Sequence, residues 1–120
     1  MSTAKGRSGE AHAAAFLQRR GFTILEHNVR LGRGELDLIA RRDDLLLFVE
    51  VKFHRQRESS LLAVHPEKCA RLRSAAEAWL AHHPEYANLQ CRFDLMIVTP
   101  RVGLPAWIPP GIEQMEDIIR

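Results

Sequence analysis

The chain has 120 residues, enough for one hydrophobic core but too few for two, so the sequence predicts a single domain spanning 1–120. Hydrophobic residues make up 46% and charged residues 27%, which is ordinary for a globular protein. No apolar run approaches the roughly 18 residues of a membrane helix, and the polar start does not resemble a secretory signal. A formal charge of +2 permits nucleic-acid binding but excludes the strongly basic class of dedicated binders.

The first half of the chain predicts one helix followed by three strands. Apolar residues at helical spacing predict the helix over 8–20, with Ser8 as its N-cap and Gly21 just after its end. Strands are then predicted over 22–30, 35–42 and 45–53, of which 35–42 alternates apolar and polar residues. In the second strand, Leu36, Leu38 and Ala40 are expected on one face, with Glu35, Asp37 and Ile39 on the other. Turns are expected at 31–34 and at Asp43–Asp44.

The second half predicts a long helix and at least one more strand. Residues 54–64 read as a polar, mobile loop, and Pro66 fits the first turn of a helix ending near His83. The next strand is predicted over 91–99. Residues 105–109 fit a short fifth strand or an extended edge, and 115–120 could add a helical turn. The two cysteines, Cys69 and Cys91, lack metal-type spacing and are expected to be reduced and buried, as in a cytoplasmic protein.

This order, α-β-β-β-α-β, predicts the α/β class with a mixed β-sheet flanked by helices. Three consecutive strands joined by tight turns favour an antiparallel meander. The connection from 45–53 through a helix to 91–99 is long enough to make those two strands parallel and central.

Two charged residues interrupt the most hydrophobic strand, in the stretch FVEVK that contains Glu50 and Lys52. If Asp43 and Asp44 are the two loop residues of the preceding hairpin, Asp37 lies directly opposite Glu50. Opposed side chains in a sheet have Cβ atoms about 4.5–5.5 Å apart. A register slip of one residue would move Asp37 to the other face.

Two carboxylates held face to face repel each other unless a proton or a cation lies between them. A hard divalent cation such as Mg²⁺ or Mn²⁺, with waters completing its octahedron, fits this geometry. Lys52, on the same face as Glu50, could orient a metal-bound water or offset charge on a phosphate. The alternative is a surface ion pair between Glu50 and Lys52 on an edge strand.

Asp37 followed by Glu50-Val51-Lys52 after a strand-turn-strand resembles the PD-(D/E)xK motif of restriction-endonuclease-like folds. The wider pattern is similar to the YraN family of bacterial proteins, which resemble archaeal Holliday junction resolvases. It covers residues 6 to 98 and comprises Gly6, Gly9, Glu10, Asn28, Arg30, GELDLIA, FVEVK, Lys68 and RFD. One departure is His54, followed by Arg55, where the family usually has Arg two residues beyond the motif lysine.

The resemblance implies a restriction-endonuclease-like fold and a phosphodiesterase acting on DNA, including branched DNA, as a homodimer. It implies catalytic roles for Asp37, Glu50 and Lys52. The metal ligands would be the same two carboxylates with Glu10 and the Val51 carbonyl. Residues placed to contact phosphates, in loops or on the second helix, are Arg30, Arg33, Arg55 and Lys68.

Each of these residues also has a simpler interpretation. Glu10 could offset the dipole of the first helix, Glu35 could pair with Lys52 or a neighbouring arginine, and Lys68 could be a solvated helix lysine. Asp94 is interpreted as a structural ion pair with Arg92, and His82 and His83 as caps of a helix end. The function therefore has three open interpretations: a metal-dependent DNA endonuclease, a non-catalytic nucleic-acid-binding module, or an interaction protein whose carboxylate pair is structural.

Overall fold

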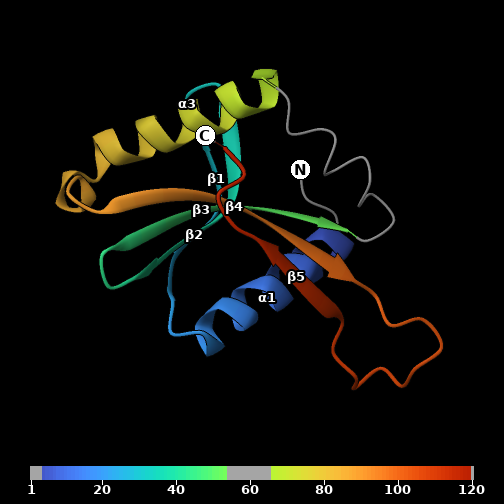
Figure 1. Ribbon diagram of the computed structural model, residues 1–120. Coiled ribbons are helices and arrows are strands. Elements are labelled where there is room, and N and C mark those ends of the chain that lie inside the picture. The colour runs from blue at the N-terminus through green and yellow to red at the C-terminus, as the bar shows by residue number, and fades with distance from the viewer. Residues whose placement is uncertain (1–3, 54–65, 120) are drawn as a thin grey trace.

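The computed structural model describes residues 4–53 and 66–119. In this part of the chain a five-stranded mixed sheet lies between two helices (Figure 1). Helix α1 (Ala4–Arg19) covers one face of the sheet and helix α3 (Pro66–His82) covers the other. The predicted α/β class and the predicted order of elements are confirmed.

The described strands follow one another across the sheet in chain order, β1-β2-β3-β4-β5. The first three are joined by tight turns and run antiparallel, whereas β3 and β4 are parallel because the chain crosses over through α3. This confirms both the predicted meander and the predicted parallel pair. The strands are β1 (Thr23–Leu31), β2 (Gly34–Arg42), β3 (Leu45–Phe53), β4 (Gln90–Thr99) and β5 (Gly111–Met115).

The hairpin between β2 and β3 has the predicted register. Arg42 pairs with Leu45, so Asp43 and Asp44 form a two-residue turn, in which Asp43 has a positive φ of 52°. The pairing continues to Leu38 opposite Val49 and stops there, within two strands that are described over their whole length. Beyond that point β2 stays paired with β1, and β3 with β4. The two strands therefore part just before Asp37 and Glu50.

The core has two halves, one on each side of the sheet. Against α1 lie Leu38, Ala40, Leu47 and Val49, and against α3, with its buried Trp79, lie Leu36, Ile39, Leu46 and Phe48. The prediction that Leu36 shares a face with Leu38 and Ala40 is therefore wrong. It assumed strict alternation along β2, whereas Leu36 packs on the α3 side and Leu38 on the α1 side, close to where the β2–β3 pairing ends.

Helix α1 begins at Ala4, so the predicted start with Ser8 as N-cap is wrong. The predicted stop is confirmed: Gly21 has a φ of +88°, and the Phe22 N–H donates to the Leu17 carbonyl at 3.0 Å. A glycine just past the last turn adopts this left-handed conformation without steric cost.

The C-terminal segment differs from both predictions made for it. Residues 105–109 form no strand, because this proline-rich stretch offers few N–H donors to a ladder. The fifth strand is instead β5, and residues 116–119 form neither a helix nor a strand, with Asp117 at a positive φ of 57°. Their backbone N–H groups are used by β4: Ile118 donates to the Phe93 carbonyl at 2.8 Å, and Asp117 donates to the Asp94 carboxylate at 3.0 Å.

Three other predictions are settled or limited by the structure. Cys91 is exposed near the start of β4, so the prediction that it is buried is wrong, and Cys69 is partly buried. The predicted loop over 54–64, with His54 and Arg55, lies outside the described residues. No helix among the described residues is long and apolar enough to cross a membrane.

Candidate functional site

The site begins where β2 and β3 part. At this point the carboxylate of Asp37 replaces a backbone acceptor: the Val51 N–H donates to its Oδ2 at 2.7 Å. A carboxylate that accepts a backbone hydrogen bond is held in one orientation. Asp37 on β2 is therefore held against β3 at Val51, the residue that follows Glu50.

The pKa of Asp37 is raised from 3.8 to about 7. Burial is the main cause, and the Val51 N–H opposes it by stabilising the ionised form. The carboxylates of Glu10, Glu50 and Glu35, in decreasing order, raise the pKa further. Like charges therefore gather around Asp37, as the hairpin register predicts, and such a cluster favours a bound cation.

Glu10 reaches this cluster from helix α1. Its side chain is buried, with 8% of its surface exposed, although a lone buried carboxylate is costly. Because α1 starts at Ala4, Glu10 lies in the middle of the helix, and the first turn contains no acidic residue. The helix-dipole interpretation of Glu10 is therefore wrong, since that effect is confined to the first turn.

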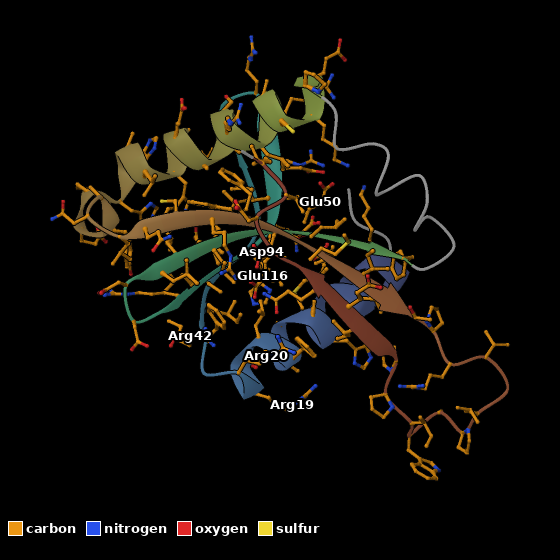
Figure 2. The ribbon with its side chains drawn as sticks, viewed as in Figure 1. Arg19, Arg20, Arg42, Glu50, Asp94 and Glu116 are labelled. Carbon is orange, nitrogen blue, oxygen red and sulfur yellow. The ribbon has the colours of Figure 1, made fainter. Side chains whose placement is uncertain are left out.

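Glu50 contacts two lysines, one on its own strand and one on α3. Its Oε1 lies 3.2 Å from the Lys52 Nζ and 2.8 Å from the Lys68 Nζ. Strand β3 lies between β2 and β4 in the sheet and the Glu50 side chain is only 15% exposed, so the interpretation as a surface pair on an edge strand is wrong. In Figure 2, Glu50 lies between the sheet and α3.

Lys52 carries its positive charge firmly. Burial alone would lower the pKa of this ammonium, but the neighbouring Glu50 carboxylate outweighs burial, and the net pKa is raised. A lysine in this state donates hydrogen bonds and does not act as a base near neutral pH. It can therefore orient a water or stabilise a phosphate, as predicted.

The donor chemistry of this cluster fits a hard divalent cation. Magnesium typically takes one or two carboxylates from a protein and keeps several waters, and Asp37 with Glu50 or Glu10 would supply them. Within the described part of the chain, no three His, Cys, Asp or Glu side chains are already grouped to hold a metal ion. The Val51 carbonyl stays a predicted ligand.

An open cleft of about 960 Å³ adjoins the cluster, between the β1–β2 turn and the first two turns of α3. Arg30 and Arg33, two of the residues predicted to contact phosphates, line it. Five cationic and three acidic side chains surround it, so its lining is net positive. The charged lining residues are Arg30, Arg33, Glu35, Glu50, Lys52, Glu67, Lys68 and Arg71.

Several secondary interpretations are settled around this cleft. Glu35 pairs with Arg30 at 3.0 Å, which confirms the ion-pair interpretation with a neighbouring arginine. Lys68 is not a solvated lysine, because its side chain is only 26% exposed and contacts Glu50. Arg71 joins the site without a sequence motif to mark it. Its spacing of three residues from Lys68, about one helical turn, is the signal that would place both on one face.

The β1–β2 turn is docked tightly on α3. A Cβ added to Gly34 would lie 2.3 Å from the Arg71 carbonyl oxygen, so only glycine allows this approach. We expect Gly34→Ala to lower the free energy of unfolding by about 1–3 kcal/mol, the usual effect of overpacking. Urea denaturation would measure it. Gly111→Ala, whose Cβ would make only ordinary contacts beyond 3.6 Å, should change stability much less, and equal effects would contradict the close approach.

Asp94 lies outside this site and has a structural role. Its fully buried carboxylate accepts two hydrogen bonds from Arg92, both at 2.9 Å, and one from Gln114 at 2.8 Å. The predicted structural ion pair is thus confirmed. His82 and His83 also have their predicted places, each with Nδ1 on a carbonyl in the last turn of α3.

Residues 9–98 match the model of the uncharacterised protein family UPF0102. The chain belongs to this family. A UPF0102 protein of Rhodopseudomonas palustris (strain BisB18) is 42% identical over 108 residues, which cover 90% of this chain and 79% of that protein. UPF0102 proteins of Bradyrhizobium diazoefficiens and Nitrobacter winogradskyi are each 44% identical over 96 residues, 80% of this chain and 72% and 81% of theirs.

The matched UPF0102 region includes every element of the site. It starts one residue before Glu10 and ends at the penultimate residue of β4. UPF0102 is the YraN family, so the match confirms the predicted family. It does not test the predicted nuclease fold or activity.

Proposed function

We propose that this UPF0102 protein is a metal-dependent DNA endonuclease, acting on branched or otherwise shape-defined DNA. The observation that supports it is the cluster of Asp37, Glu10 and Glu50 where β2 and β3 part. The Lys52 ammonium forms an ion pair with Glu50 in this cluster. Buried like charges with a perturbed pKa, beside a cationic cleft, are typical of a functional site. The proposed restriction-endonuclease-like relationship rests on the spacing of Asp37, Glu50 and Lys52.

In this proposal Asp37, Glu50 and Glu10, with the Val51 carbonyl, hold Mg²⁺ or Mn²⁺. The bound ion would polarise the scissile phosphate and supply a more acidic water. The Lys52 ammonium orients that water and offsets the negative charge that develops on the phosphate. Arg30, Arg33 and Lys68 contact neighbouring phosphates along the cleft, and Arg55 is proposed to do the same from outside the described residues.

The test is Mn²⁺-dependent cleavage of a panel of duplex, flap, four-way and single-stranded DNA. We expect the wild-type protein to cut at least one substrate and Lys52→Ala to cut it about 10²–10³ times more slowly, as when one stabilising donor is removed. Glu77→Ala, an exposed position elsewhere on α3, is the matched control and should cut normally. Equal cleavage by Lys52→Ala and wild type would contradict the role of Lys52 and with it this proposal.

A second candidate is a nucleic-acid-binding module without turnover. The contact of both lysines with Glu50 favours it, because that carboxylate is already neutralised without a metal. Salt-dependent DNA binding that survives Asp37→Ala, with no Mn²⁺-dependent nicking of any substrate, would establish this candidate. Two further expectations stay predictions: the cytoplasmic location, expected from the sequence, and the homodimer, implied by the family resemblance.

A further inference from the structure

Two of the three lysines in the chain contact the same carboxylate oxygen. Of 17 basic residues only Lys5, Lys52 and Lys68 are lysines. The Nζ atoms of the latter two lie 3.2 and 2.8 Å from Glu50 Oε1. The lysine from α3 is the closer of the two, although the sequence motif contains only Lys52. The position that a metal ion would take on Glu50 is therefore partly served by a protein cation.

The helix itself does not explain Lys68. This residue is the third of α3, in the first turn, where the helix dipole disfavours a positive charge. Glu67, the preceding residue, is the acidic side chain of that turn. The ion pair with Glu50 offsets the unfavourable position of this charge in the first turn. This indicates that Lys68 has its role in the site and not in stabilising the helix.

An ammonium suits a contact that must be broken. Arginine binds a carboxylate through two parallel hydrogen bonds in a rigid fork, whereas lysine is a point charge on a flexible stem that can exchange partners. Lys68 also lines the cationic cleft, so an anion there offers it another partner. The same side chain can therefore reach Glu50 or a phosphate.

We propose that Lys68 is a displaceable counter-cation of Glu50, a positioning residue that yields this carboxylate to the metal and then binds a substrate phosphate. This inference rests on the metal site of the proposed function. In the metal-free protein, Lys68 keeps Glu50 neutralised and in place. When a divalent cation takes Glu50, Lys68 is released into the cleft, so metal and DNA strengthen each other's binding.

The test is calorimetric titration of the whole protein with Mn²⁺, without DNA. Lys68→Gln removes the competitor and should raise the Mn²⁺ affinity roughly fivefold or more, the lower end of common coupling effects. Lys68→Arg keeps the charge but can hold Glu50 through two bonds, so it should lower the affinity. Arg71→Gln removes one charge from the same cleft and should change the affinity less than twofold, which separates competition for Glu50 from a general charge effect.

A second measurement is the DNA affinity of each variant with and without Ca²⁺, by fluorescence anisotropy. The gain in DNA affinity on adding Ca²⁺ should shrink in Lys68→Gln. Unchanged or weaker Mn²⁺ binding by Lys68→Gln, or an equal rise in Arg71→Gln, would overturn the role of Lys68 and leave the endonuclease proposal standing. Absence of Mn²⁺ binding in the wild type and every variant would overturn both, whereas the predicted affinities without DNA cleavage would overturn only the endonuclease.

Discussion

Asp94→Ala should lower the free energy of unfolding by about 3–5 kcal/mol, the usual result of removing one partner from a buried ion pair. The substitution deletes the acceptor of four hydrogen bonds, two from Arg92, one from Gln114 and one from the Asp117 N–H. Stabilities of 120-residue proteins are typically about 6–18 kcal/mol, so this is a large fraction of the total. Chemical denaturation followed by tryptophan fluorescence would measure the loss.

The physical reason is that Asp94 joins β4 to the last segment of the chain (Figure 2). Its carboxylate oxygens hold β5 through Gln114 and the residues after β5 through the Asp117 N–H. Glu116→Ala is the matched control, because Glu116 also contacts Arg92, at 3.5 Å, but is 59% exposed. Exposed ion pairs contribute about 0–1 kcal/mol. A loss in Asp94→Ala no larger than in Glu116→Ala would contradict the anchoring role.

The second large effect is expected for Asp37→Asn, measured as stability against pH in EDTA. The folded pKa of about 7 exceeds the ordinary value of 3.8, so the folded protein binds the extra proton between these values. Stability from this group is fully present below pH 4 and is lost as pH rises through 7. The free energy of unfolding of the metal-free wild type should therefore fall, on the order of 4 kcal/mol between pH 4 and 8.

Asparagine cannot ionise, yet its amide oxygen can still accept the Val51 hydrogen bond. Asp37→Asn should therefore remove this slope and be more stable than wild type at pH 8 without metal. Saturating Mn²⁺ at pH 8 should stabilise the wild type but not the variant, because a ligand stabilises only the state that binds it. Parallel pH profiles of the two proteins would show that Asp37 does not carry the perturbed pKa.

Local patterns were sufficient to predict most of the framework. Runs of strand-forming residues located β1 to β4, and the Asp43–Asp44 turn set the register of β2 and β3. These features depend on neighbours within a few residues, which a sequence displays directly. The failures at the C-terminus depend on a distant partner, since the N–H groups of Asp117 and Ile118 donate to acceptors on β4 and not within a helical turn.

The candidate site was predicted where it follows from one hairpin and not where it depends on packing. Asp37 and Glu50 directly follow the last pair of the β2–β3 ladder, Leu38 opposite Val49, and Lys52 lies two residues further on, so their proximity was predictable from the hairpin although they do not pair in it. The burial of Glu10 depends on how α1 lies on the sheet, and its position in that helix was misjudged because the helix starts earlier than Ser8. The contact between Lys68 and Glu50 joins elements separated by a crossover, and no pairing rule predicts such a contact.

The hydrogen bond from the Val51 N–H to Asp37 makes one carboxylate serve both the sheet and the proposed metal site. Where the two strands part, the side chain of the acid takes a position that a neighbouring backbone carbonyl holds elsewhere in the ladder. Asp37→Ala would thus remove a charge and leave a sheet donor unpaired in the same step. Inactivity of that variant alone could not separate lost chemistry from a loosened sheet. An amide at position 37 separates them, since it keeps the acceptor and removes only the charge.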